Sequence, residues 1–304
     1  MNDLTSPAAS WQARKLTKRA IDMMEEPDHE RIAHVQKDVF IPYKRATEVL
    51  DAMERLLKAP TVIRPRNMLL LAKPNNGKSS LLREFLRRHP GEERIEEDNV
   101  HLPVIFVQAP PEPRRTDFED SLLGAMRLDA KNVADKKSVI CSQLQKMNTR
   151  MILIDEVNAL LVGSANSQRK LLNNIKYISN ESRTSIVLAG APETYNAVQL
   201  DDHTQTRFPT VLMKRWTASS HDFRTFLASY ESILPLRQPS GLHKLNKVFA
   251  ELTQLVLGNV VTLIQDSAIA AIERRQPDAE CITEELLRQC ATTRDVMTAE
   301  MKQL

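Results

Sequence analysis

The chain has 304 residues, a formal net charge of +3 and a pI of about 8.7, and 42% of its residues are hydrophobic and 27% charged. This composition is typical of a soluble globular protein with one large domain or two smaller ones, and its mild basicity is compatible with nucleic-acid binding without indicating it. No apolar run approaches the ~18–20 residues of a membrane span, and the N-terminal stretch lacks the apolar core of a secretory signal, so we expect a cytoplasmic protein with no membrane partner.

The first 220 positions alternate between helical and strand patterns. Residues 1–38 are polar and indicate an N-terminal arm or a loosely held helix rather than core. An amphipathic helix is predicted over 44–58 from apolar residues at i, i+3, i+4 and i+7. Short apolar runs predict buried strands at 68–71, 104–107, 151–154 and 185–188, separated by helical patterns that follow residue 78 and lie near 117–127, 136–147 and 165–180. Strands that alternate with helices predict an α/β fold with a parallel sheet flanked by helices.

After about residue 220 the strand patterns stop. The four remaining segments are all predicted as helices, at 221–233, 242–257, 260–275 and 283–302. We therefore expect three parts: an arm at 1–38, an α/β nucleotide-binding domain at 39–220, and an all-helical lid at 221–304.

The three cysteines are predicted to be free thiols. Cys141, Cys281 and Cys290 form no C-x-x-C pair and lie near no histidine at zinc-ligand spacing. This usage is typical of a reducing compartment.

A phosphate-binding motif follows the first predicted strand. The segment fits the P-loop pattern G-x-x-x-x-G-K-[ST] except that Ala72 replaces the first glycine, and its candidate nucleotide-binding residues are Ala72, Pro74, Asn75, Asn76, Gly77, Lys78, Ser79 and Ser80. In such a loop the backbone N–H groups point at the phosphates, Lys78 reaches the β- and γ-phosphates, and the Ser79 hydroxyl binds Mg²⁺. The alternative is a chance match in a βα turn, which the flanking strand and helix disfavour. The motif predicts ATP and Mg²⁺ as ligands.

Two carboxylates end the third predicted strand. Asp155 and Glu156 follow the apolar run 151–154. We expect Asp155 to orient a water on Mg²⁺ and Glu156 to polarise the attacking water. Capping of the following helix is the alternative role. An adjacent acid pair downstream of a P-loop indicates ATP hydrolysis rather than nucleotide sensing.

The order of P-loop, Asp-Glu strand, fourth strand and helical lid resembles an AAA+ P-loop ATPase. Several segments are similar in more detail to the TniB/TnsC family of transposition regulators, from about residue 30 to the C-terminus; they are Phe40–Ala46, Arg64–Leu70, Asn75–Lys78, Ala189–Glu193, Arg207–Phe208 and Leu234–Ser240. The Asn-Asn-Gly-Lys and Leu-Pro-Leu-Arg segments are the ones most specific to this family.

The resemblance implies an ATP-dependent regulator of DNA transposition. Such proteins oligomerise on double-stranded target DNA as a hexameric ring or helical filament, contact its backbone without reading sequence, and link a target-selector protein to the transposase, with ATP hydrolysis controlling disassembly. The alternatives are a DNA-replication or helicase-loader-type ATPase of the same fold, and a partner-binding scaffold with vestigial activity. The complete set of Lys78, Ser79, Asp155 and Glu156 disfavours the scaffold.

Two positions depart from the family pattern. Ala191 stands after the fourth strand, where the family commonly has a threonine sensor, and Glu193 and Asn158 are the alternative sensors. The lid segment 257–261 has no arginine to contact a γ-phosphate. Both departures predict slow hydrolysis that depends on a neighbouring subunit or partner.

The AAA+ resemblance also implies an arginine finger. Arg207 lies where such proteins present a guanidinium to the nucleotide of the next subunit, and Lys214 and Arg215 are alternative fingers. Pairing of Arg207 with Asp201 or Asp202 in its own subunit is the structural alternative.

The same resemblance implies that adenine lies between the segment before the first helix and the lid. Ile41 and Tyr43 are therefore the candidate contacts to the base. The alternative is that both side chains pack the helix onto the core.

A proline-rich loop after the second strand is the candidate DNA contact. A stiff loop with two guanidiniums and a hydroxyl suits phosphate-backbone contacts. The candidates are Arg114, Arg115 and Thr116, with Lys131, Lys136 and Lys137 beside them in a pore. An exposed basic loop without a partner is the alternative.

Overall fold

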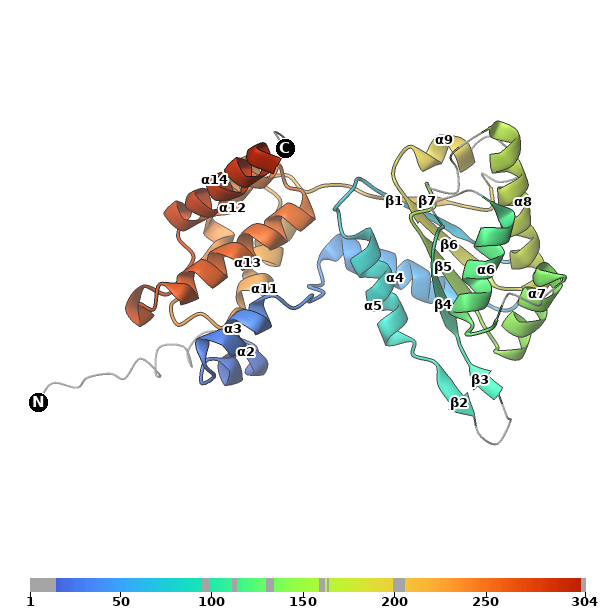
Figure 1. Cartoon of the computed structure of the whole chain (residues 1–304), viewed down its shortest axis with the longest axis horizontal. Helices are drawn as coiled ribbons and strands as arrows, with labels where there is room; N and C mark the ends of the chain where they lie inside the picture. Colours follow the sequence, from blue (N-terminus) through green and yellow to red (C-terminus); the bar gives the residue numbers. More distant parts are fainter. Residues whose placement is uncertain are drawn as a thin grey trace, which may run out of the picture. The chain divides into compact units, whose positions relative to one another are not determined.

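The structure, a computed structural model, describes residues 15–94, 99–110, 114–129, 134–158, 162, 164–198 and 206–301. The chain divides into two compact units (Figure 1). One unit is α/β and spans 45–214, and the other is helical and combines 1–44 with 215–304.

A five-stranded sheet forms the centre of the α/β unit. Its strands are β1 (Met68–Ala72), β4 (Val104–Gln108), β5 (Met151–Asp155), β6 (Ser185–Gly190) and β7 (Thr210–Met213). They lie in the order β4-β5-β6-β1-β7, and every neighbouring pair is parallel. Two short strands, β2 (Glu92–Arg94) and β3 (Asn99–His101), pair antiparallel apart from this sheet. The predicted parallel sheet flanked by helices is confirmed.

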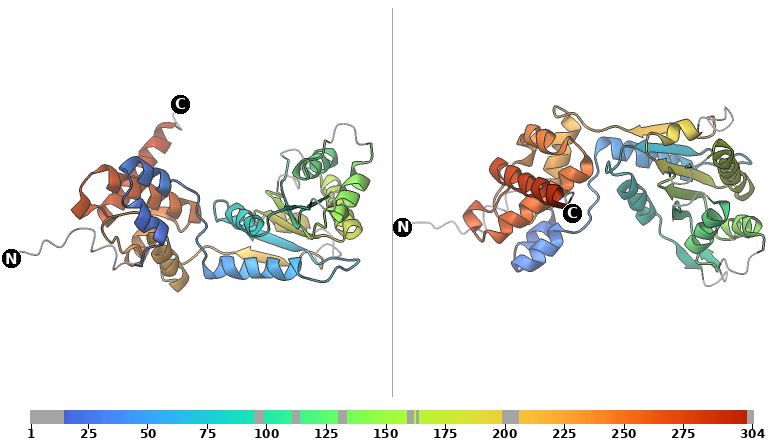
Figure 2. Two further views of the ribbon diagram at one scale, coloured as in Figure 1. Left: turned by 90° about the horizontal axis from the view of Figure 1, so that it is seen from below. Right: turned by 45° about the horizontal axis from the view of Figure 1, so that its top comes forward.

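Helices cover both faces of the sheet (Figures 1 and 2). On one face lie α4 (Lys44–Leu57) and α5 (Lys78–Arg88), and on the other lie α6 (Arg115–Ala125), α7 (Lys136–Lys146) and α8 (Ala165–Ser182); the short α9 (Thr194–Val198) follows β6. Alternate strand residues, such as Leu69 and Leu71 of β1, belong to one buried cluster with Phe118, Leu122 and Ile175. This alternation follows from the two-residue period of a strand, and it explains why the buried runs are apolar throughout.

The helical unit has its own core. Its helices are α2 (Lys18–Met23), α3 (Asp28–Val35), α11 (His221–Glu231), α12 (Asn246–Thr253), α13 (Leu257–Glu273) and α14 (Glu284–Met301), with 3₁₀ turns at η3 (Leu242–Lys244) and η4 (Pro277–Ala279). The ring of Trp216 lies 5.2 Å from that of Phe223 and 4.9 Å from that of Phe226. Both α3 and α14 pack against α13.

The structure divides the chain differently from the sequence prediction. The described residues of the expected arm form α2 and α3 and belong to the helical unit, so the division falls at 44/45 and 214/215. The predicted helix 242–257 is instead η3 and α12, because the chain turns at Gln254 and Leu255, which both have left-handed φ values. Strand β7 was not predicted, because it begins with the polar Thr210 and only Met213 of its four residues is buried, so it lacks the pattern of a buried strand.

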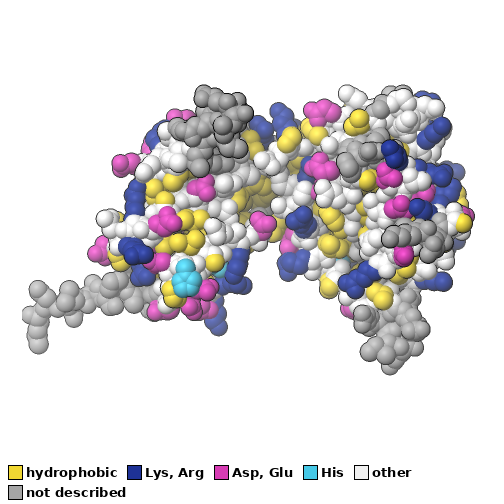
Figure 3. All heavy atoms as spheres, viewed as in Figure 1, with side chains coloured by type: hydrophobic (Ala, Val, Ile, Leu, Met, Phe, Trp, Pro, Cys, Tyr) yellow, Lys and Arg dark blue, Asp and Glu magenta, His cyan; other side chains and the backbone are white. Residues whose placement is uncertain are grey.

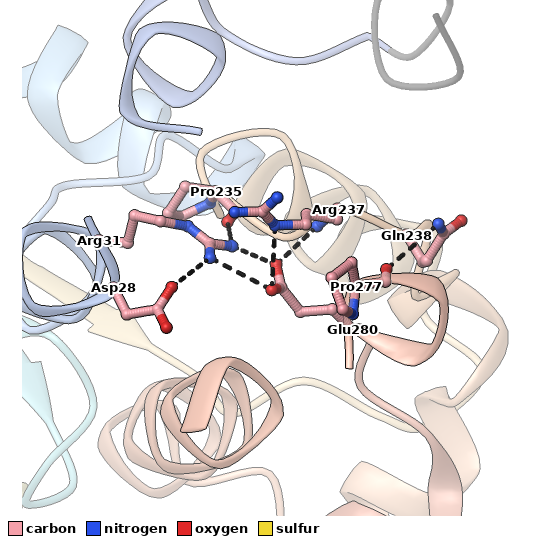
Figure 4. Close-up of polar contacts among 7 residues, drawn as sticks. All are labelled: Asp28, Arg31, Pro235, Arg237, Gln238, Pro277 and Glu280. Carbon is pink, nitrogen blue, oxygen red and sulfur yellow. Dashed lines mark hydrogen bonds and ion pairs between the residues drawn. The ribbon is translucent and has the colours of Figure 1, made fainter. Parts of the chain in front are cut away.

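A buried ion pair ties α3 to the end of the helical unit (Figure 4). The guanidinium of Arg31 is fully buried, donates to both carboxylate oxygens of Glu280, and donates to the Pro235 carbonyl oxygen at 2.6 Å. Glu280 also accepts the backbone N–H of Arg237 at 2.9 Å. The polar α3 is therefore fixed by charge as well as by apolar packing.

The cysteines Cys141, Cys281 and Cys290 are free. Burial raises the pKa of the Cys141 thiol to about 11, so this side chain stays protonated at neutral pH.

Within the described residues, no single helix is both long and apolar enough to span a membrane. One pair, α12 with α13, meets these criteria jointly, but the two helices are bent by 113°.

Replacing Glu280 by alanine should destabilise the helical unit. Arg31 would then keep only the partly exposed Asp28, 3.0 Å from its Nη1, as a carboxylate partner, and the loss of unfolding free energy should approach the roughly 3–5 kcal/mol typical of a broken buried pair. Urea unfolding followed by the fluorescence of Trp216 measures the change. Glu251→Ala is the matched control, because the pair of Glu251 with Arg288 is exposed and should contribute little. Equal losses in the two variants would contradict the importance of the buried pair.

Candidate nucleotide-binding site

The loop after β1 has the backbone shape of a phosphate cradle. Ala72 ends β1 in register with Met213 of β7 and does not have a positive φ, so its methyl group fits without strain. Asn75 and Gly77 have left-handed φ values of 57° and 82°. Asparagine tolerates this conformation better than other side chains, and glycine adopts it freely.

Side chains of the loop divide into structural and ligand-facing ones. Asn76 is buried, and its Nδ2 donates to the Met213 carbonyl oxygen at 3.0 Å, which anchors the loop to β7. Helix α5 begins at Lys78 directly after Gly77. Its first N–H groups have no partner within the helix and are directed at an anion. Ser79 is half-buried, whereas Pro74 and Ser80 are exposed.

The acid pair lies at the carboxyl end of β5. Asp155 is buried, and its Oδ1 accepts the backbone N–H of Glu156 at 2.9 Å. Glu156 has a left-handed φ of 53° and a side chain that is 43% exposed. The Nζ of Lys78, whose side chain is only 7% exposed, lies 3.4 Å from Glu156 Oε1. The fold thus brings together a buried cation and two carboxylates from segments 78 residues apart.

A threonine that the sequence prediction missed lies beside this strand end. Thr194 is buried, and its Oγ1 has no hydrogen-bond partner among the described residues. A Cβ placed on Gly190, at the end of β6, would meet this oxygen at 2.6 Å and Val157 Cγ1 at 3.0 Å. Of the two alternative sensors, Asn158 has a buried Oδ1 that also lacks a partner, and Glu193 is exposed. The sequence around Thr194 contains no motif that marks it as a site residue. Only the turn after β6 brings Thr194 back to the end of that strand.

Arg207 lies at the opposite edge of the sheet. Its carbonyl oxygen accepts the N–H of Asn67, at the amino end of β1, and its Nη1 donates to Asn180 Oδ1 at 3.2 Å. The five residues of β1 separate the two edges by roughly 16 Å. Lys214 instead follows β7 at the edge of the P-loop. The alternative partners of Arg207, Asp201 and Asp202, lie outside the described residues.

The candidate adenine contacts and the alternative finger Arg215 belong to the helical unit. Ile41 is buried in the core of that unit. The ring of Tyr43 packs edge-on against Trp216 at 4.8 Å and against Phe226 at 6.1 Å.

The candidate DNA residues lie at the beginnings of two helices. Arg114 and Arg115 start α6, where Arg115 lies 3.4 Å from the buried Glu119, and Thr116 donates to Asp117 at 3.2 Å. At the start of α7, Lys136 contacts Asp120 at 2.5 Å and Lys137 lies over the ring of Tyr177 at 4.1 Å. Lys131 is outside the described residues.

On the face shown in Figure 3, Lys and Arg side chains are interspersed with Asp and Glu, so the basic side chains visible there form no uniform positive field.

The residues at the strand end fit a nucleotide-held magnesium ion. Ser79 and Asp155 offer the hydroxyl and carboxylate oxygens that Mg²⁺ uses when phosphates supply the other ligands. Within the described ranges, no group of three or more His, Cys, Asp or Glu residues is arranged to hold a metal. This donor set matches an ion that arrives with its nucleotide.

Several solved structures are similar to this chain in fold. The Orc1 protein of Aeropyrum pernix in complex with DNA has a TM-score of 0.58 at 16% identity, covering 86% of this chain and 69% of that one. The ADP form of the Aeropyrum pernix Orc2 protein has a TM-score of 0.61 at 12% identity, covering 86% and 72%. Cdc6p of Pyrobaculum aerophilum has a TM-score of 0.58 at 14% identity, covering 84% and 69%. A search of curated protein sequences gives no significant match.

The P-loop at the end of β1, the sheet order and the C-terminal helices define an AAA+ ATPase fold. Residues 31–218 match the family model described as "Bacterial TniB protein". The chain therefore belongs to the TniB family, and the suspected family is confirmed.

Proposed function

We propose that the chain binds and hydrolyses ATP at the carboxyl edge of the sheet. The observation that carries this proposal is the approach of the Lys78 ammonium to the strand end that bears Asp155 and Glu156. Incoming phosphates would replace Glu156 as the partner of Lys78, which frees the carboxylate to accept a proton from the attacking water. Ser79 and Asp155 would hold Mg²⁺, which supplies positive charge to the phosphates. Thr194 and Asn158 offer polar atoms near this edge.

The proposed contacts to the nucleotide base come from the segment before α4. Ile41 and Tyr43 are the proposed adenine contacts, because an apolar and an aromatic side chain can pack against a purine ring. Their packing inside the helical core supports the alternative role equally well. Pro74, Asn75 and Ser80 would contact the phosphates as parts of the P-loop and of the helix start that follows it.

The biological role we propose is that of an ATP-dependent regulator of DNA transposition. Membership of the TniB family supports this role. Similarity of fold to Orc1, solved in complex with DNA, supports binding to DNA, which we propose to be duplex DNA contacted through its backbone. We further propose that the chain assembles into a ring or filament on DNA and contacts a transposase and a target selector. These steps would take place in the cytoplasm.

A replication-type ATPase is the second candidate function. The similarity of fold to Orc1, Orc2 and Cdc6p favours it. The family match favours the first candidate, because sequence similarity over 31–218 is more specific than a shared fold at 12–16% identity. Pull-down experiments distinguish the two candidate functions. ATP-dependent binding to a transposase supports the first, and ATP-dependent binding to a replicative helicase supports the second.

We propose that Arg207 acts on the nucleotide of a second copy of the chain. It lies at the edge opposite its own P-loop and is therefore badly placed to reach its own ATP. A guanidinium supplied across an interface stabilises charge on the transferring phosphoryl group. Lys214, at the P-loop edge, is a poorer choice for this role in trans.

Lys78→Ala should abolish ATP binding, since the phosphates lose their buried cation. Lys73→Ala is the matched control, because Lys73 is exposed in the same loop and should leave binding intact. Isothermal titration with ATP and Mg²⁺ measures both variants. Equal affinity of Lys78→Ala and wild type would exclude this loop as the phosphate site.

Glu156→Gln should retain ATP binding but lower turnover by about 10²–10⁴-fold, because an amide cannot accept the proton of the attacking water. Phosphate release in the presence of DNA measures the rate. Wild-type turnover in this variant would show that a group other than Glu156 accepts the proton of the attacking water.

Arg207→Ala should retain ATP binding in the isolated subunit and lose both hydrolysis and ATP-dependent assembly on DNA. The expected rate loss is about 10³-fold or more. Sedimentation with DNA and a non-hydrolysable ATP analogue checks assembly. Complexes of normal size would show that Arg207 is not the arginine finger. Arg215 would then be the candidate, and Arg215→Ala the next variant.

Arg114→Ala combined with Arg115→Ala should weaken duplex binding and reduce the slope of log K against log salt by about 0.9 for each lost phosphate contact. Fluorescence anisotropy at several salt concentrations measures both quantities. Arg87→Ala with Arg88→Ala is the control, since this adjacent pair lies at the far end of α5 and binds Glu84. An unchanged slope in the α6 variant would exclude the loop.

A further inference from the structure

The cations proposed to contact DNA lie where helices of the α/β unit pack side by side (Figure 1). Helix α7 packs against α6 on one side and against α8 on the other. Arg115 begins α6, and Lys136 and Lys137 begin α7. Each of these three cations has a partner within the unit, and the charge of that partner decides how much positive charge remains for an outside anion.

The start of α7 is an unfavourable place for two lysines. The N-terminus of a helix carries a partial positive charge, which favours acids in the first turn and disfavours cations. The first turn of α7 reads Lys-Lys-Ser-Val and contains no acid. The N-cap Asp135 is occupied, since its side chain accepts the backbone N–H of Ser138 at 3.2 Å. Lys136 and Lys137 therefore do not stabilise their own helix, and partners on the neighbouring helices hold them.

These adjacent lysines have partners of different charge. The Nζ of Lys136 lies 2.5 Å from Asp120 Oδ1 on α6. The Nζ of Lys137 lies 4.1 Å from the centre of the Tyr177 ring on α8. A carboxylate cancels the charge of a lysine, whereas an aromatic ring attracts the cation through its quadrupole and leaves the net charge unchanged. The pair of Lys137 with Tyr177 thus stays positive, and the pair of Lys136 with Asp120 is neutral.

Arg115 is paired in a way that lets it turn outward. Its Nε lies 3.4 Å from Glu119 Oε1, but the Arg115 side chain is 63% exposed and that of Glu119 only 4%. Glu119 Oε1 also accepts the Nδ2 of Asn174 at 3.2 Å, so the buried carboxylate keeps a hydrogen bond when Arg115 leaves. The other pair is reversed, because Asp120 is 42% exposed and Lys136 only 22%. A phosphate that approaches Lys136 therefore meets a negative charge.

We propose that the Asp120 carboxylate takes the place of a DNA phosphate on Lys136 in the free chain, and that it thereby limits the affinity of the chain for duplex DNA. The inference rests on the proposed DNA binding. A phosphate that binds Lys136 has to displace Asp120, and the displaced carboxylate then lies beside the duplex, where like charges repel. Arg115 and Lys137 can bind phosphates without displacing an exposed carboxylate.

Asp120→Asn should strengthen duplex binding. The released Lys136 adds one phosphate contact per bound subunit, which steepens the slope of log K against log salt by about 0.9 and raises the affinity roughly three- to tenfold at about 0.1 M salt. Fluorescence anisotropy of the full chain with a labelled duplex and a non-hydrolysable ATP analogue, over a series of salt concentrations, measures both quantities. A wild-type slope in this variant would overturn the proposal.

Two further variants control for the change in charge and for the new amide. Glu181→Gln removes an exposed carboxylate from α8 and should leave the slope unchanged. Asp120→Ala removes the carboxylate without adding a group that can donate to phosphate, and it should steepen the slope as Asp120→Asn does. An equal gain in Glu181→Gln, or no gain in Asp120→Ala, would contradict a specific exchange at Lys136.

The adjacent lysines provide the sharpest comparison. Lys137→Gln should reduce the slope by about 0.9 whether or not Asp120 is present. Lys136→Gln should leave the slope of the wild type nearly unchanged, but it should remove the whole gain that Asp120→Asn produces. A gain that persists in the double variant of Asp120→Asn with Lys136→Gln would show a general effect of charge and overturn the proposed exchange.

The inference and the proposed DNA binding fail in different ways. Weaker binding by the variant Arg114→Ala with Arg115→Ala, together with no effect of Asp120→Asn, would overturn the inference alone. Absence of duplex binding in both the wild type and Asp120→Asn would contradict the proposed DNA binding, and the inference with it.

Discussion

The parallel pairing of β1 with β6 on one side and β7 on the other is the constraint on which the rest of the molecule depends. Because all five strands of this sheet run in one direction, every βα loop emerges at one edge and every αβ loop at the other. The P-loop, the Asp155–Glu156 pair and the end of β6 therefore share the carboxyl edge. Arg64, Asn180 and Arg207 share the amino edge. One sheet thus separates the P-loop and the acid pair from Arg64, Asn180 and Arg207 within the same unit.

The carboxyl edge combines unusual backbone with buried charge. Asn75, Gly77 and Glu156 all have left-handed φ values, and the first two shape the loop while the third ends the acidic strand. Such conformations persist where surrounding contacts hold them, and here the side chain of Asn76 and the carboxylate of Asp155 provide hydrogen bonds. The unpartnered hydroxyl of Thr194 lies at the same edge. Left-handed backbone and an unpartnered polar atom thus occur together where the ligand is expected.

The helical unit depends on a different interaction. Burial of Arg31 against Glu280 joins the N-terminal α3 to residues near the C-terminus, 249 positions later. A buried pair of this kind contributes little net stability, but loss of Glu280 would leave the buried Arg31 with only the partly exposed Asp28 as its counter-charge. The N-terminal segment therefore belongs to the helical unit even though its composition is polar and its apolar periodicity is weak.

The sequence by itself determined the α/β class, the positions along the chain of four of the sheet strands, most helices and the identities of the P-loop and acidic residues. These features are local, because a buried strand, an amphipathic helix or a P-loop is encoded within a few consecutive residues. Only the tertiary structure decided the short edge strand β7, the membership of α2 and α3 in the helical unit, the position of Thr194, and the different partners of Lys136 and Lys137. Each of these depends on contacts between residues far apart in the chain. No local pattern records such contacts, since strand pairing and buried ion pairs bring distant residues together only after the chain has folded.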